Sequence, residues 1–275
     1  MNLLVLALIV AAAVSVAVAM MYAVRRTARA DFFLTDTTRG SAIFGVVGTA
    51  FAVLLAFVMF VAFNSFNEAR DSAEGEASAV GSMFRTARFF SPAERDRLQG
   101  ELNCYGRAVV EQEWSAMSSG ETSPVVDRWR LDIENTIRSI DLKTLNEQAG
   151  YRELLLERTT RSEARRERVL ESDPIISPPV WFILALGGLA TVSFVLLFTD
   201  RRESFFVQGS LMAMVAALVS ASLVLVWFLD HPYERATGSI EPTEMERTLA
   251  NMEREAPGLT SPCDLRGDPI AGSAG

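Results

Sequence analysis

The sequence "AIFGVVGTAFAVLLAFVMFVAF" occupies residues 42–63, and "NSFNEARDSAEGEASAVGSMF" follows it directly at residues 64–84. The first part carries no charge and exceeds the about 20 apolar residues that a helix needs to cross a bilayer. Neither a proline nor a glycine pair interrupts the junction, and the alanines of the second part recur at helical spacing. We therefore predict one long helix that crosses the membrane and continues beyond it.

Three other uncharged stretches have the same length and composition, and almost all charged residues lie between the four stretches. Only helices and closed barrels satisfy every backbone polar group in lipid, and these compositions are helical. We predict an all-α membrane protein with four transmembrane helices in the lipid bilayer. Besides Ala42–Phe63, the spans are Leu3 to about Val24, Val180–Thr199 behind Pro178-Pro179, and Phe205–Leu229.

The first span could also be a cleaved signal peptide. A signal peptide carries positive charge before a shorter apolar run. Here no charge precedes Leu3, and Arg25, Arg26 and Arg29 follow the run. We expect a retained helix.

The spans divide the chain into four parts. Residues 1–63 hold the first two transmembrane helices, residues 64–177 form a helical extramembrane domain, and residues 178–229 hold the other two spans. Proline start signals at Pro92 and Pro124 and a charged stretch over 145–170 indicate the helices of the domain. The tail, residues 230–275, begins with a short helix from Pro242 and is Gly-, Ser- and Pro-rich after about 257, where we expect it to be flexible.

Arginines in the short links predict the orientation. The positive-inside rule places arginine-rich short links in the cytoplasm. Both termini and residues 64–177 then face outward from a bacterial plasma membrane. Several arginines of the 64–177 domain lie on the other side, but they are mixed with glutamates, and long loops cross largely regardless of charge. The link arginines are Arg25, Arg26, Arg29 and Arg39, then Arg201 and Arg202.

The only two cysteines, Cys104 and Cys263, lie in the domain and in the tail. Any four-span topology places them in the same compartment. Outside the cell we expect them to pair, and the alternative is two unrelated thiols, buried or exposed.

Little in the sequence points to chemistry. The net charge of −8 argues against a nucleic-acid partner, His231 is the only histidine, and no glycine-rich phosphate loop is present. We expect no enzymatic activity, metal or cofactor. Asn64, Glu68 and Asp71 share one helical face where the second span leaves the membrane. In a ring of subunits they would form an acidic pore mouth, which favours cations. The alternative is a solvated helix face with local pairing to Arg70.

Three segments resemble a known family: "FNSFNEARDSAEGEASAVGSMFRTARFF" from Phe63, "CYGRAVVEQEW" from Cys104 and "LDHPYERATGSI" from Leu229. They are similar to the bestrophin-like family of unknown function in bacteria and plants, over roughly Ser41 to Leu249. The resemblance implies a distant relation to pentameric anion channels and lends weight to the motif positions. Those positions are Glu68, Arg70, Glu76, Ala77, Glu113, Trp114, Asp230 and Pro232.

Two functions remain open at this point. The resemblance implies a homo-oligomeric ion channel, and the alternative is a non-conducting scaffold or sensor whose outer helical domain binds a partner. Bestrophins keep their large soluble region in the cytoplasm, whereas the arginine count places it outside. These two expectations conflict.

Topology and cysteine pairing can be measured together. We expect a reporter that is active only in the cytoplasm to stay silent when fused after Gly275, because the arginine-rich links face inward.

Mass mapping of unreduced peptides should show Cys104 linked to Cys263. A cytoplasmic signal from the reporter, or two freely alkylated thiols in freshly isolated membranes, would contradict the outward orientation.

Overall fold

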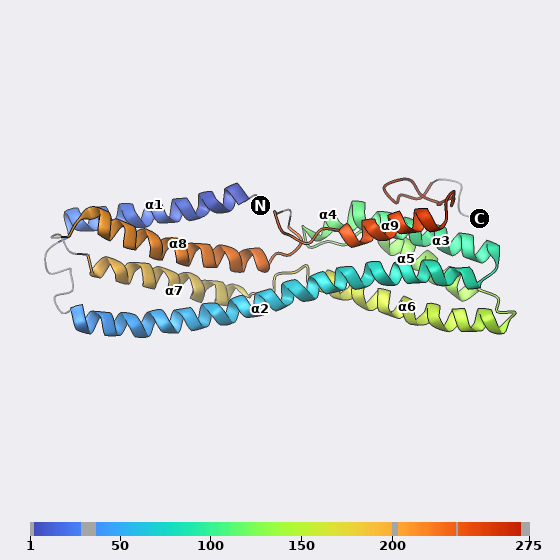
Figure 1. Cartoon of the computed structure of the whole chain (residues 1–275), viewed down its shortest axis with the longest axis horizontal. Coiled ribbons are helices and arrows are strands. Elements are labelled where there is room, and N and C mark those ends of the chain that lie inside the picture. Colours follow the sequence, from blue (N-terminus) through green and yellow to red (C-terminus); the bar gives the residue numbers. More distant parts are fainter. Residues whose placement is uncertain (1–2, 29–36, 200–202, 235, 271–275) are drawn as a thin grey trace. The chain divides into compact units, whose positions relative to one another are not determined.

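The computed structural model describes residues 3–28, 37–199, 203–234 and 236–270, and within these ranges the chain is helical without a β-strand. Arg29, Arg201 and Arg202, which support the orientation, lie outside the described residues. The chain divides into two compact units. The helices, shown in Figure 1, are α1 Leu3–Thr27, α2 Thr37–Thr86, α3 Pro92–Ala108, α4 Trp114–Met117, α5 Pro124–Ser139, α6 Leu145–Leu170, α7 Pro178–Leu197, α8 Phe205–Leu229 and α9 Thr243–Glu255, with short turns η2 Ala87–Phe89 and η3 Val109–Glu113.

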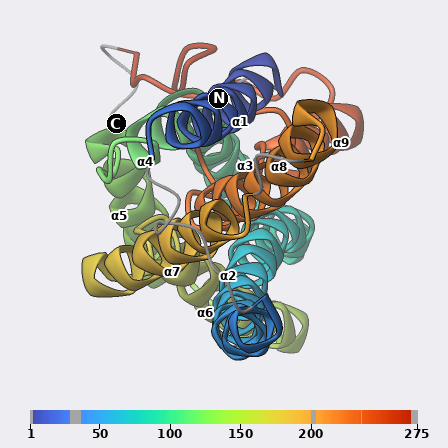
Figure 2. The same ribbon diagram turned by 90° about the vertical axis from the view of Figure 1, so that its left-hand side faces the viewer.

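The membrane unit comprises residues 1–65, 174–231 and 235–238. Its helices α1, α7, α8 and the first part of α2 are long and apolar enough to cross a bilayer, which confirms the predicted four spans. Helix α1 runs alongside α8 (Figures 1 and 2). Ala17 and Met21 of α1 pack there against Met212 and Ala216 of α8. Small side chains at this contact let the two backbones approach closely.

Two glycines bring α7 close to its neighbours. A Cβ atom at Gly187 would lie 2.4 Å from the ring of Phe51 in α2, and one at Gly188 would lie 2.9 Å from Val219 in α8. By contrast, Cβ atoms at Gly45 and Gly48 of α2 would meet nothing within 4 Å among the described residues. This face of α2 therefore has no neighbour within the described part of the chain.

Helix α2 is continuous from Thr37 to Thr86, which confirms the predicted long helix. Its alanine face is buried in the second part of the helix. Ala69 is 0% exposed and Ala73 is 9% exposed, and both pack with Met117 and Tyr233. One turn later, Ala77 joins the main core of the second unit.

The second unit, the helical domain, comprises residues 66–173, 232–234 and 239–275. Its helices begin where the sequence predicts. Ser91 and Glu94 form a capping box at α3, with Pro92 at the first helical position, and Thr144 and Glu147 form another at α6. The core lies between the second part of α2 and α3, α5, α6 and α9. Its fully buried residues include Phe84, Leu98, Leu102, Ile133 and Leu154.

The tail does not form the loose segment expected after residue 257. The backbone oxygen of Gly267 accepts a 2.7 Å hydrogen bond from Trp129 Nε1 of α5. Gly267 has φ +83°, and a Cβ atom there would lie 2.5 Å from the backbone nitrogen of Ala108. The composition indicated a chain without regular structure, but such a chain is still fixed when it supplies buried hydrogen bonds. Residues 239–270 thus belong to the helical domain.

A disulfide also connects the tail to the helical domain. The sulfur atoms of the two cysteines are 2.07 Å apart and their Cα atoms 5.7 Å apart, so the structure joins Cys104 of α3 to Cys263 of the tail. Both residues are part of the main core. Because the bond closes a loop across 159 positions, it restricts the unfolded chain strongly.

The alanine face of α2 can be tested by overpacking. We expect Ala73→Leu to lower the free energy of unfolding by roughly 1–3 kcal/mol, because a buried site has no room for the extra atoms. Glu74, the next residue, is exposed and pairs only with exposed Arg70 among the described residues, so Glu74→Gln should cost less. Thermal unfolding of the detergent-purified variants compares the two. Equal melting temperatures would mean that the alanine face does not hold the domain together.

Candidate functional site: a buried network of arginines and carboxylates

Three elements of the helical domain meet at a buried charge network. Helix α2 contributes Glu76, the π-helical turn η3 contributes Glu113, and α6 contributes Arg165 and Arg168. The arginines lie three residues apart and therefore project from the same side of α6. Turn η3 follows α3 directly, and π-helical turns occur often at functional positions.

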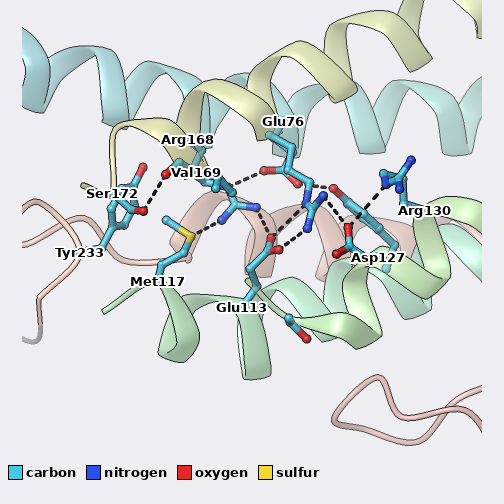
Figure 3. Close-up of polar contacts among 12 residues, drawn as sticks. Glu76, Glu113, Met117, Asp127, Arg130, Arg168, Val169, Ser172 and Tyr233 are labelled. Atoms are coloured by element: carbon cyan, nitrogen blue, oxygen red, sulfur yellow. Dashed lines mark hydrogen bonds and ion pairs between the residues drawn. The ribbon is translucent and has the colours of Figure 1, made fainter. Parts of the chain in front are cut away.

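Arg168 is the centre of the network and is 0% exposed. Its Nε donates to Glu76 Oε2 and its Nη2 to Glu113 Oε2, both at 2.5 Å. Its Nη1 lies 2.6 Å from the sulfur of Met117. Figure 3 shows the guanidinium between these three side chains. The guanidinium also lies over the ring of Trp114, 5.1 Å from its centre, where a cation is attracted to the π face.

Two further residues occupy the remaining carboxylate oxygens. Arg165 donates to Glu113 Oε1 at 2.5 Å and to Asp127 at 3.0 Å. The Tyr105 hydroxyl donates to Glu76 Oε1 at 2.5 Å. All four oxygens of the two buried glutamates therefore accept a hydrogen bond. Such a network is stable only when every member is satisfied.

The network determines which groups are charged. Burial disfavours the charged form of Glu113, but Arg168 and Arg165 outweigh it and hold the pKa of this carboxyl below its usual range. Burial likewise opposes the charge on Arg168, while Glu76 and Glu113 raise the pKa of its guanidinium. Burial, together with the neighbouring Glu76 charge, raises the pKa of the Tyr105 hydroxyl. The arginines and Glu113 thus stay charged, and the Tyr105 hydroxyl stays protonated and donates its hydrogen bond.

Trp114 links the network to the segment after α8. Its Nε1 donates to the Ile240 carbonyl at 3.0 Å, and the Ile240 amide donates to the Pro232 carbonyl at 2.9 Å. Tyr233 packs edge-on against Trp114 with ring centres 5.5 Å apart, and its hydroxyl donates to the Ala69 carbonyl. Trp114 thus ties this segment to α4, and Tyr233 ties it to α2.

Asp230 acts separately, within the membrane unit. It is 2% exposed and follows the last residue of α8. Its Oδ1 accepts hydrogen bonds from the amides of Ile175 and Ile176 at 2.9 and 3.0 Å. Its Oδ2 lies 3.4 Å from Trp181 Nε1. The carboxylate therefore fastens the end of α8 to the segment that leads into α7.

The structure separates the predicted residues into two groups. Glu76, Glu113 and Trp114 come together in the buried network, whereas Arg70 is exposed and pairs with Glu74. The candidate pore-mouth residues Asn64, Glu68 and Asp71 are exposed on α2. The sequence reasoning missed the partners. The spacing of Arg161, Arg165 and Arg168, which places them on one helical face, is the signal in the sequence that points to them.

The comparisons with known proteins match most of the chain. A model of the Bestrophin-like domain family matches residues 7–244. The chain belongs to this family. Among solved structures, a bacterial bestrophin homologue from Klebsiella pneumoniae carrying a point mutation has a TM-score of 0.66 at 16% identity, covering 90% of this chain and 98% of the other. A membrane protein with a proline-to-alanine substitution has a TM-score of 0.67 at 17% identity, covering 88% and 98%. A search of the curated proteins found no match.

These likenesses confirm the resemblance and the fold class: a Bestrophin-like, all-α protein with four transmembrane helices and an inserted helical domain. Identities of 16 and 17% show the fold alone. Within the described ranges, no cluster of three or more His, Cys, Asp or Glu side chains could hold a metal ion. The buried network can fix α2, η3 and α6 relative to one another within the domain.

The charge of Glu113 can be tested by pH. Because its folded pKa is depressed, Glu113 contributes stability above the ordinary carboxyl pKa of 4.5, and this contribution is lost as the pH falls through the folded pKa. We expect Glu113→Gln to cost roughly 3–5 kcal/mol at neutral pH, because it leaves buried arginines without a counter-charge. Glu111→Gln, at an exposed glutamate two residues earlier on η3, is the matched control.

Urea unfolding of the purified protein at pH 7 and at acidic pH makes this comparison. The wild type and Glu111→Gln should lose stability together on acidification, and Glu113→Gln should lose less because the titrating group is gone. Parallel losses in all three proteins would show that Glu113 does not hold the network in its charged form.

Proposed function

We propose that this chain is a subunit of a homo-oligomeric, bestrophin-like ion channel in the bacterial plasma membrane, with α2 facing the pore. Membership of the family supports the proposal, and the exposed face of α2 carries it. Asn64, Glu68 and Asp71 are exposed there, at the end of an uncharged span. In contrast, the other motif carboxylates, Glu76, Glu113 and Asp230, are buried.

The apolar part of α2 is consistent with this arrangement. Phe57, Phe60 and Phe63 are 64%, 61% and 52% exposed in the single chain. Either lipid or further subunits must therefore cover much of this helix. The absence of any neighbour at Gly45 and Gly48 in the described residues supports subunits, since small residues on transmembrane helices allow close helix contacts.

The proposed pore would prefer cations. Each subunit would add the carboxylates of Glu68 and Asp71 to a ring, and rings of Asp and Glu select for cations. Their accessible positions on α2 leave these carboxylates free to act on ions in solution. The distant relation to anion channels concerns the fold and does not decide the ion.

We further propose that the helical domain and both termini face outward. The arginines of the short links support this orientation. The disulfide between Cys104 and Cys263 supports it as well, because disulfides persist in oxidising compartments and are rare in the cytoplasm.

Ion flux in liposomes tests the proposal. We expect the reconstituted protein to conduct and to prefer cations over anions when the two gradients are set separately. The double variant Glu68→Gln, Asp71→Asn should lower the cation-to-anion permeability ratio several-fold, because it removes the charges of the ring. Glu74→Gln changes an exposed carboxylate of the same helix that pairs with Arg70, and should leave the ratio unchanged.

Two results would count against it. An unchanged ratio in the double variant would remove Glu68 and Asp71 from the pore. A lack of flux above that of protein-free liposomes, with the protein folded and inserted, would favour the other function: a non-conducting scaffold or sensor whose helical domain binds a partner.

A further inference from the structure

A third arginine on α6 lies in the core of the helical domain without a carboxylate. Arg161 is 0% exposed, as buried as Arg168. Its guanidinium lies over the ring of Tyr105, 4.9 Å from the centre. Its Nη2 makes one long contact, 3.5 Å, with the hydroxyl of neighbouring Ser162. Its Nε and Nη1 find no acceptor among the described residues.

The neighbouring arginines show what such a side chain needs. Arg168 binds two buried glutamates, and Arg165 binds Glu113 and Asp127. No described carboxylate lies within 4.0 Å of Arg161. A buried charge is tolerated when it is paired and hydrogen-bonded, and otherwise it is among the most destabilising features that a core can hold. Because a guanidinium does not give up its proton in proteins, Arg161 cannot escape the penalty by becoming neutral.

The glutamates of the network pair with other residues, and neither forms an ion pair with Arg161. Both oxygens of Glu76 and both of Glu113 already accept hydrogen bonds from Tyr105, Arg165 and Arg168. The network therefore has three neighbouring arginines on α6, Arg161, Arg165 and Arg168, and its two fully buried carboxylates, Glu76 and Glu113, form ion pairs with Arg165 and Arg168 only. Asp127, the other partner of Arg165, is 44% exposed and shares its charge with solvent. One negative charge beside Arg161 would supply the counter-charge that this guanidinium lacks among the described residues.

We infer that Arg161 holds a small monovalent inorganic anion, of the kind of chloride, inside the helical domain. The anion would accept hydrogen bonds from the guanidinium nitrogens that no described group occupies, on a side chain whose direction is fixed by the ring of Tyr105. It would stabilise the domain and take no part in conduction. The site is thus independent of the proposed pore, and its test does not require ion flux.

One side chain of the domain could compete with the anion. Glu157 lies one helical turn before Arg161 on α6, and its Oε1 accepts a hydrogen bond from Thr86 at 3.1 Å. Its other carboxylate oxygen, Oε2, is buried and receives no hydrogen bond from any described residue. If Glu157 turned toward Arg161, it would neutralise the guanidinium without an anion, at the loss of the Thr86 bond. The two arrangements predict different responses to chloride.

Thermal unfolding of the full-length, detergent-purified protein distinguishes them. The two buffers contain chloride or gluconate at equal ionic strength and pH, since gluconate is too large for a buried site. We expect the melting temperature of the wild type to be a few degrees higher in chloride, because a ligand that binds only the folded state stabilises it. Arg161→Met should abolish the chloride increment. Arg166→Met, which removes an exposed arginine of the same helix, should retain it.

A second measurement does not depend on how the variant folds. A crystal structure of the wild type grown in bromide should show anomalous scattering within hydrogen-bonding distance of the Arg161 guanidinium. The inference is overturned if the wild type melts equally in the two salts, if Arg161→Met keeps the increment, or if no bromide appears beside Arg161. A carboxylate oxygen of Glu157 in contact with Arg161 in that crystal would also overturn it.

Discussion

The helical domain depends on the pairing of Arg168 with Glu76 and Glu113. A guanidinium that is 0% exposed strongly destabilises a core unless counter-charges meet it, and α2, η3 and α6 bring two such charges to Arg168. The bonds are directional, and each carboxylate must approach a different edge of the guanidinium. The network therefore fixes the rotation of the helices about their axes, which small apolar contacts such as that between Gly75 and Ala164 fix less well.

The segment after α8 and the tail complete the domain through the same elements. Trp114, which follows the network residue Glu113, holds the carbonyl of Ile240, and Trp129 of α5 holds that of Gly267. Indole N–H groups suit this purpose, because a large apolar ring fills the core while its one donor satisfies a buried carbonyl. The joined cysteines add a covalent link between α3 and the tail. The position of the segment after α8 and of the tail thus depends on a few specific contacts with residues far away in the sequence.

Much of the fold could be predicted from the sequence because its causes are local. A span such as Phe205–Leu229 is recognisable by length and lack of charge, and Pro92 and Pro124 lie at helix starts. The ordered tail and the partners of Glu76 could not be predicted in this way. They depend on contacts between residues far apart in sequence, such as Arg168 and Glu76, and a single sequence does not show which charges meet. The exposed pore-mouth residues were identified from helical spacing alone, so their role stays a prediction.

The carboxylates of α2 are of two kinds, buried and exposed, and this difference limits what family membership says about ion selectivity. Glu76 is occupied by Arg168 and Tyr105, whereas Glu68 and Asp71 point to solvent from the same helix. A buried, fully hydrogen-bonded carboxylate cannot contact a passing ion, so Glu76 and Glu113 stabilise the fold of this chain and say nothing about ion selectivity. Selectivity has to lie with accessible groups, where a charge can change without disturbing the core. Membership of the family therefore does not decide which ion a member passes, or whether it passes one at all.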